Sequence, residues 1–175
     1  MNKSVLMALF AIIGLLQAES NQARATFAGG CYWCMEEAME KIQGVTSVTS
    51  GFEGDVEAVD ILFDPARITY EELLEAYWKN IDPLDEGGQF CDRGAKYRSA
   101  IFYHDEIQRR AAIQSKNRIE NRLKQPVATA INEADMFSVA PEEDQDYYKN
   151  QPDRYHQYKT KCRRSERLRE LWGAQ

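Results

Sequence analysis

The stretch RATFAGGCYWCMEEAMEKIQG, residues 24–44, places a strand pattern, a glycine pair and a helix pattern in direct succession. The pattern predicts a short strand over 24–28, a tight turn at Gly29 and Gly30, and a helix over 31–42 that Gly44 closes. Cys31 therefore stands where a strand ends and a helix begins. A fold that starts with this unit has to cover the strand with the helix.

The later elements are predicted by periodicity and by capping and breaking residues. Strands are predicted over 45–52, 57–63, 97–103 and 127–131, helices over 69–80, 105–124 and 144–158, and a glycine-containing loop over 82–96. Thr69 and Glu72 form a capping box, and Pro152 breaks the last helix. This order predicts an α/β two-layer sandwich with a mixed or antiparallel sheet covered by helices, and a ferredoxin-like topology is the simplest that fits.

The first 18 residues, MNKSVLMALFAIIGLLQA, have the layout of a secretory signal peptide: a lysine near the start, an apolar run and a small residue at the end. The apolar run is short for a membrane span, which needs about 20 residues. We therefore expect cleavage after Ala18, a periplasmic or secreted protein without a membrane segment, and one domain over 19–175. An uncleaved N-terminal anchor is the alternative.

The charge of the chain argues against one class of partner. The formal net charge is −6, so a nucleic-acid partner is disfavoured. Arginines alternate with acids over 163–169, which predicts a solvated helix face. We expect a monomer.

The chain has four cysteines: Cys31, Cys34, Cys91 and Cys162. A domain of this length does not need disulfides in order to fold, so structural disulfides explain the four cysteines only weakly. The unpaired amides at a helix start favour an anion, so we expect a depressed pKa for the Cys31 thiol, and a thiolate is the form that attacks. Two other readings remain: a structural Cys31–Cys34 bridge in an exported protein, and a zinc site, which is disfavoured because CxxC occurs only once.

Six blocks of the sequence, in order, resemble the peptide methionine sulfoxide reductases of the A type. They are GGCYWCMEE (29–37), GDVEAVDILFDP (54–65), ITYEELLEAYWKNIDP (68–83), GQFCDRGAKYRSAIFY (88–103), DQDYYKNQPDRYHQY (144–158) and LRELWG (168–173). The resemblance spans about residues 26–173. It implies an oxidoreductase that reduces methionine (S)-sulfoxide, free or in oxidised proteins.

The resemblance also implies the roles of individual residues. Cys31 would be the nucleophile, and Tyr32 and Trp33 would cradle the methyl group of the substrate. Three further residues would surround the sulfoxide oxygen: Glu57, Asp92 and Tyr97. The sulfoxide oxygen leaves poorly unless it is protonated, so a carboxyl group such as that of Glu57, kept neutral by desolvation, suits the chemistry.

Attack on the substrate leaves a sulfenic acid on Cys31, which a second thiol has to resolve. Cys162 ranks first because it matches a family position on the C-terminal tail. Cys34 and Cys91 remain candidates, either alone or in a relay of two disulfides. No metal or organic cofactor is expected, and the implied electron donor is a thioredoxin-like protein.

Three positions depart from the family pattern. The GFEG turn, residues 51–54, runs almost directly into Glu57, and the shortened loop lacks a tyrosine that binds the sulfoxide oxygen in fuller members. Asp55 and Asp144 stand where the family often has histidines. These departures bear on substrate affinity more than on the reaction type.

Two other functions compete with a sulfoxide reductase. One is a general thiol-disulfide oxidoreductase that uses Cys31 and Cys34, although no cis-proline loop of the thioredoxin type is evident. The other is a binding module without catalysis, with a pocket walled by Tyr32 and Trp33 and all cysteines bridged.

Overall fold

The structure, a computed structural model, describes residues 22–173. The expected signal peptide over 1–18 lies outside the described residues. Within residues 22–173, no helix combines the length and the apolar character needed to cross a bilayer.

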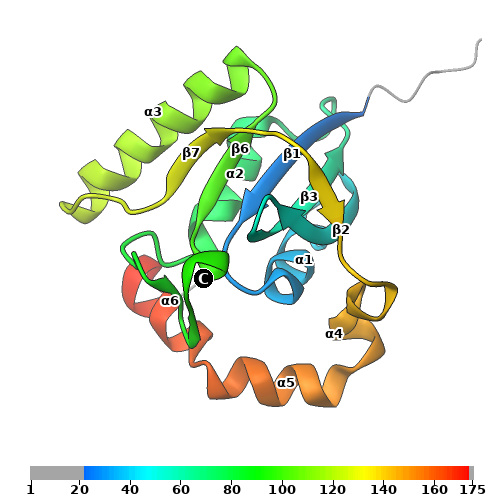
Figure 1. Cartoon of the computed structure of the whole chain (residues 1–175). Coiled ribbons are helices and arrows are strands. Elements are labelled where there is room, and N and C mark those ends of the chain that lie inside the picture. The colour runs from blue at the N-terminus through cyan, green and yellow to red at the C-terminus, as the bar shows by residue number, and fades with distance from the viewer. Residues whose placement is uncertain (1–21, 174–175) are drawn as a thin grey trace, which may run out of the picture.

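A curled sheet of six strands forms the centre of the molecule (Figure 1). In sheet order the strands are β7 (Ala130–Glu133), β6 (Ala100–Tyr103), β1 (Ala23–Ala28), β3 (Val56–Phe63), β2 (Val45–Glu53) and β8 (Phe137–Val139). A separate hairpin consists of β4 (Gly88–Gln89) and β5 (Asp92–Arg93). The helices are α1 (Tyr32–Glu40), α2 (Tyr70–Lys79), α3 (Glu106–Leu123), α4 (Tyr147–Asn150), α5 (Pro152–Lys161) and α6 (Arg164–Trp172).

The predicted ferredoxin-like core is confirmed. The four central strands have the order β6-β1-β3-β2, and all three pairs among them are antiparallel. Helix α1 connects β1 to β2, and α2 follows β3, as the β-α-β-β-α-β order requires. Strand β7 then joins β6 in parallel, and β8 extends the other edge beside β2, so the complete sheet is mixed.

The main core lies between the sheet and the helices. Its largest fully buried side chains include Phe27 of β1, Met35 and Met39 of α1, and Tyr77 and Trp78 of α2. The predicted capping box at the start of α2 is confirmed, because the Thr69 side chain accepts from the Glu72 amide and Glu72 accepts from the Thr69 amide. A smaller cluster of Ala28, Ala58, Ala100 and Phe102 covers part of the opposite face.

Some element bounds differ from those predicted. The strand expected over 97–103 begins at Ala100, because Ala95–Tyr97 form a 3-10 turn. The strand expected over 127–131 begins at Ala130, since Val127 packs into the core and the Ala128 amide bonds to the carbonyl of Pro83. The loop expected over 82–96 contains the β4-β5 hairpin.

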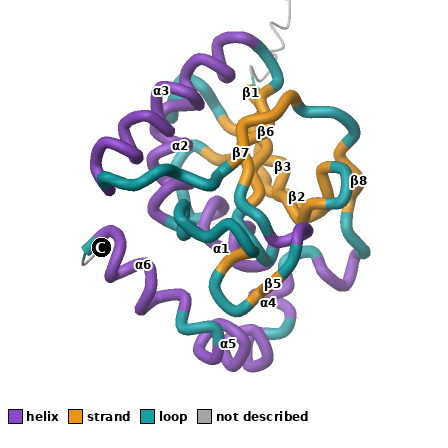
Figure 2. The backbone as a smooth tube through the Cα atoms, turned by 60° about the vertical axis from the view of Figure 1, so that its left-hand side comes forward, coloured by secondary structure: helices purple, strands orange, loops and turns teal. Residues whose placement is uncertain are grey.

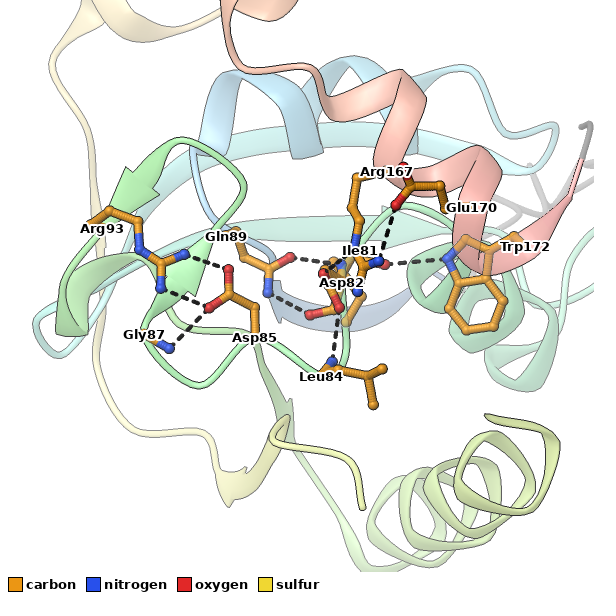
Figure 3. A network of polar contacts seen from close by, with 10 residues as sticks. All are labelled: Ile81, Asp82, Leu84, Asp85, Gly87, Gln89, Arg93, Arg167, Glu170 and Trp172. Atoms are coloured by element: carbon orange, nitrogen blue, oxygen red, sulfur yellow. Dashed lines mark hydrogen bonds and ion pairs between the residues drawn. The ribbon is translucent and has the colours of Figure 1, made fainter. Parts of the chain in front are cut away.

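In Figure 1, α5 runs below α1, with α4 at the lower right and α6 at the left, and Figure 2 shows the same order of α4, α5 and α6 from another side. Polar contacts attach α6 to the loop after α2 (Figure 3). Arg167 donates to Asp82 at 2.6 Å, and the indole of Trp172 donates to the carbonyl of Ile81 at 3.3 Å. Gln89 joins the hairpin to the same loop by accepting from the Asp82 amide and donating to its carbonyl.

The prediction of a solvated face over 163–169 is wrong for Arg164. This side chain is 4% exposed, and its guanidinium donates to the backbone carbonyls of Gly29 and Asn80 and stacks over the ring of Phe90. The alternation of charges along a sequence does not reveal that one arginine of a helix points inward. Because of this contact, α6 positions a cation next to the turn that precedes Cys31.

Candidate active site

The turn between β1 and α1 brings Cys31 to the end of the sheet. A Cβ atom at Gly29 would lie 2.4 Å from Sδ of Met35, and Gly30 has a φ of +84° with Gln89 directly beside it. Neither position accommodates a larger residue without strain, so the glycine pair is what allows the strand to pass directly into the helix. Cys31 is the N-cap of α1, as its position in the sequence indicates.

Cys31 and Cys34 form a buried pair, 5% and 4% exposed. The thiol of Cys31 donates to the sulfur of Cys34, which lowers the pKa of Cys34 to about 6. The positive charge of Arg164 and the hydroxyl of Tyr155 also lower the pKa of Cys34, against the effect of burial. These contacts favour the charged form on Cys34 over the charged form on Cys31.

The depressed pKa expected for Cys31 is therefore wrong in this state. Its hydrogen bond to Cys34, its burial and the negative charges of Cys34 and Glu57 raise the pKa of Cys31, and a hydrogen bond from Tyr158 opposes them. The amides of the first helical turn make no hydrogen bond to the Cys31 side chain. The Tyr32 amide instead donates to Oε2 of Glu57, at 3.3 Å.

Glu57 lies on β3 and is 5% exposed. Burial raises its pKa, and the charge of Asp92 adds to the effect, while hydrogen bonds from Lys96 and from the Tyr32 amide oppose it. Lys96 approaches Oε1 of Glu57 at 3.1 Å. Glu57 is thus a desolvated carboxyl group near Cys31, and Lys96 is a cation beside it that the sequence did not indicate.

Asp92 and Tyr97 approach this carboxyl group from the hairpin and the 3-10 turn. The ring of Tyr97 lies under the ammonium of Lys96, 4.5 Å from its centroid, so Tyr97 reaches Glu57 through that lysine. Asp92 accepts a short hydrogen bond from the hydroxyl of Tyr158 on α5. This hydroxyl also makes a hydrogen bond with Cys31, so Tyr158 links the hairpin to the nucleophile candidate.

Tyr32 and Trp33 form the aromatic wall of the site. Tyr32 is buried, packs edge-on against Phe52 with ring centroids 5.7 Å apart, and donates its hydroxyl to Asp144 at 3.1 Å. Trp33 stacks on Tyr147 of α4 with ring centroids 3.8 Å apart. In this arrangement a C-terminal aromatic side chain therefore covers the indole that was expected to contact the substrate.

The remaining two cysteines are paired with each other. Cys91 and Cys162 form a disulfide with their Cα atoms 4.8 Å apart, while Cys31 and Cys34 are free thiols. The structure thus brings Cys34, not Cys162, to the sulfur of Cys31. A carboxylate oxygen of Asp92 lies near both sulfurs of this disulfide. A metal site formed by Cys91, Asp92 and Cys162 would need both cysteines as thiolates, and in the disulfide their sulfurs are bonded to each other.

The sequence patterns did not indicate four contributors to this site: Lys96, Tyr155, Tyr158 and Arg164. All four lie in blocks near predicted site residues or in the C-terminal segment. The tyrosine-rich segment DQDYYKNQPDRYHQY was a usable signal, since aromatic residues with a polar end are frequent around ligand pockets. In contrast, no sequence pattern around Arg164 indicates that its side chain faces Cys34.

Comparison of the sequence with known families and proteins identifies close relatives. The chain matches the family model described as peptide methionine sulfoxide reductase over residues 23–56 and 53–175. A "Peptide methionine sulfoxide reductase MsrA" from Bacillus licheniformis is 45% identical over 168 residues, which cover 85% of this chain and 93% of the relative. The protein of the same name from Bacillus subtilis (strain 168) is 41% identical over 169 residues, covering 86% and 96%.

Solved structures share the fold at lower sequence identity. Methionine sulfoxide reductase A of Corynebacterium diphtheriae superposes with a TM-score of 0.72 at 23% identity over 81% of each chain. Mxr1 from Saccharomyces cerevisiae in reduced form has a TM-score of 0.73 at 22% identity, covering 75% of this chain and 87% of that one. Mxr1 in complex with Trx2 has a TM-score of 0.56 at 21% identity, covering 72% and 84%.

Proposed function

Since the chain belongs to the MsrA family of peptide methionine sulfoxide reductases and is an oxidoreductase, we propose that it reduces methionine (S)-sulfoxide through a sulfenic acid on Cys31. The observation that carries the proposal is the hydrogen-bonded Cys31–Cys34 pair beside the desolvated carboxyl group of Glu57. A nucleophile, a proton acceptor and a proton donor thus lie together.

The first step uses these three groups. The sulfur of Cys31 attacks the sulfoxide sulfur while its proton passes to the thiolate of Cys34, and Glu57 donates a proton to the sulfoxide oxygen. Collapse of the adduct releases methionine and leaves the oxygen on Cys31 as a sulfenic acid. The hydroxyl of Tyr158, which contacts Cys31 and Asp92, takes the place of the tyrosine that the shortened loop before Glu57 lacks.

Resolution of the sulfenic acid begins with Cys34. Its sulfur now carries the proton and lies next to Cys31, so condensation gives a Cys31–Cys34 disulfide and water. Reduced Cys91 and Cys162 then reduce this disulfide and become oxidised in turn. The described state, with Cys31 and Cys34 free and Cys91–Cys162 bridged, has the arrangement expected after that transfer.

The electron donor in this proposal is a thioredoxin-like protein. Cys91 is exposed whereas Cys162 is 9% exposed, so Cys91 is the sulfur that an external protein thiol reaches first. A solved structure of Mxr1 in complex with Trx2 shows that a protein of this fold associates with such a donor. We place the enzyme in the periplasm or outside the cell on account of residues 1–18, with oxidised proteins or free methionine sulfoxide as substrate.

The test is a single-turnover experiment with separate sulfoxide epimers and pre-reduced enzyme. The unmodified chain should form methionine from the S epimer alone. Cys31→Ser should form none. Cys34→Ser should form about one methionine per enzyme, more slowly because the proton acceptor of the first step is lost, and should leave a sulfenic acid that dimedone traps on Cys31.

A matched variant tests the relay. The double variant Cys91→Ser, Cys162→Ser should still form the Cys31–Cys34 disulfide but should turn over poorly with thioredoxin. Methionine formation by Cys31→Ser would remove Cys31 from the mechanism. Full turnover of the double variant with thioredoxin would show that the donor reduces the Cys31–Cys34 disulfide directly.

A further inference from the structure

A cavity of about 390 Å³ reaches Cys34 from the side of α6, and the proposed reaction does not use it. Its lining includes Cys34 and Glu37 from α1, Lys159 from α5, and Arg164 and Arg169 from α6, with Lys41 at the end of α1. The aromatic wall and Glu57 belong to the other side of the pair and are not part of the lining. The volume lies in the range of small-molecule sites, roughly 300–1,000 Å³.

The cavity is cationic in a chain whose net charge is −6. Four cations and one anion face it. The anion, Glu37, accepts hydrogen bonds from Lys159, Lys41 and Tyr155. Although burial opposes the effect, these contacts lower the pKa of Glu37 to about 2, so Glu37 is ionised at neutral pH. Its single negative charge neutralises only part of the positive charge of the four cations.

Neither arginine of the cavity forms an ion pair with a carboxylate in the described part of the chain. Arg164 donates to backbone carbonyls and not to a carboxylate. The exposed Arg169 pairs with no acidic side chain among residues 22–173. A compact cationic cavity of this kind attracts carboxylates.

We propose that this cavity binds a low-molecular-weight thiol that carries carboxylates, which reduces the Cys31–Cys34 disulfide at Cys34. The proposal rests on the proposed function for the origin of that disulfide. It adds a second route of reduction, which bypasses Cys91 and Cys162. Glutathione is the probe for this class of thiol.

The reduction takes two exchange steps. The bound thiol, as thiolate, attacks the sulfur of Cys34, the bond between Cys34 and Cys31 breaks, and Cys31 leaves with the electron pair and takes a proton. A second thiolate then attacks the outer sulfur of the mixed disulfide. Cys34 leaves as a thiolate and an oxidised thiol dimer is released, so two thiols supply the two electrons. Arg164 and Tyr155 stabilise the leaving thiolate of Cys34, which favours the second step.

The experiment tests ligand binding in the cavity through the modification of Cys34, in the absence of methionine sulfoxide. In Cys31→Ser with Cys91–Cys162 intact, Cys34 is the only free thiol of the four cysteines, and serine retains a hydroxyl donor towards it. The variant is treated with glutathione disulfide, which is anionic, or with cystamine, which is cationic. Intact mass gives the rate of modification, and peptide mapping gives its position.

We expect modification at Cys34, about tenfold faster with glutathione disulfide than with cystamine at low ionic strength. The added substitution Arg169→Glu should reduce the glutathione disulfide rate about tenfold, and salt should reduce the preference. Arg110→Glu on α3 makes the same charge change at an exposed position outside the cavity and should leave the rate unchanged.

Equal rates for the two reagents, an unchanged rate in Arg169→Glu, or modification mapped to Cys91 or Cys162 would each overturn the proposal. Glutathione-supported reduction of methionine sulfoxide by the double variant Cys91→Ser, Cys162→Ser is the second arm, and it should persist. If no variant and no unmodified chain forms methionine, the proposed function fails, while the modification of Cys34 still reports on the cavity.

Discussion

The substitution Glu36→Gln should stabilise the protein relative to the unmodified chain, and this stabilisation should be larger at pH 8 than at pH 5. Glu36 lies on α1 with its side chain 1% exposed, and Oε1 accepts from the Asp146 amide at 3.1 Å. Its Oε2 has no hydrogen-bond partner, and neither has the hydroxyl of Ser50 near it. A glutamine amide keeps the acceptor and places a donor at the position of Oε2, where that hydroxyl can accept.

The magnitude follows from the pKa of Glu36, which burial raises from 4.5 to about 7. The charges of Asp146 and Glu40 raise this pKa further, against the hydrogen bond from the Asp146 amide. The folded state therefore holds the proton more tightly than the unfolded chain. Each pKa unit corresponds to about 1.36 kcal/mol, so ionising Glu36 in the folded state costs about 3 kcal/mol.

Because the pKa of Glu36 is raised in the folded state, its effect on stability changes between its unfolded and folded pKa values. The stabilisation by the proton on Glu36 is fully present below pH 4.5, is lost as the pH rises towards 7, and is absent above it. The glutamine variant has no such loss. Between pH 5 and pH 8 the difference in unfolding free energy between the variant and the unmodified chain should grow by about 2 kcal/mol.

The assay is urea unfolding of both proteins at the two pH values, which measures the midpoint and the slope. All other ionisable groups are shared, so their contributions cancel in the comparison. Glu75→Gln, at an exposed position of α2, is the control and should show no such pH dependence. A difference between Glu36→Gln and the unmodified chain that is the same at pH 5 and pH 8 would refute the reasoning.

Three further predictions concern the active site. Glu57→Gln removes the proton donor and should lower kcat about a hundredfold with little change in KM, measured by chromatography of methionine. Trp33→Ala should raise KM for methionine sulfoxide about tenfold, because burial of the substrate methyl group against the indole is lost; an unchanged KM would exclude this contact. Tyr158→Phe should slow methionine formation about tenfold while leaving the subsequent formation of the Cys31–Cys34 disulfide unaffected; rapid-quench analysis of thiols and methionine separates the two.

The central fold could be predicted because its signals are local. The capping box at Thr69, the glycine pair before Cys31 and the alternation over 57–63 each act within a few residues. Strand β8, Phe137–Val139, was missed because it is three residues long and exists only through pairing with β2. The start of β7 was misplaced because Val127 is buried by tertiary packing and not by a strand.

The chemistry of the cysteines depends on contacts that sequence spacing does not contain. A helix start is a valid reason to expect a low pKa at Cys31, but in this structure the Tyr32 amide is taken by Glu57. The cation and the hydroxyl that favour a thiolate, Arg164 and Tyr155, come from the C-terminal helices and face Cys34. The hydrogen bond between the two cysteines is local, but the further contributions that lower the pKa of Cys34 come from residues more than a hundred positions away.

Helices α4 and α5 contact both the residues that act on the substrate and the hairpin that carries Cys91 of the second disulfide. Tyr158 contacts Cys31 and Asp92, the neighbour of Cys91, whereas Tyr147 stacks on Trp33. A substrate methyl group that uses the indole face has to displace the ring of Tyr147, since the two rings are 3.8 Å apart. Substrate entry therefore perturbs the same segment that carries Cys162 at the end of α5. It follows that binding of methionine sulfoxide and the exposure of the Cys91–Cys162 pair should be coupled through α4 and α5.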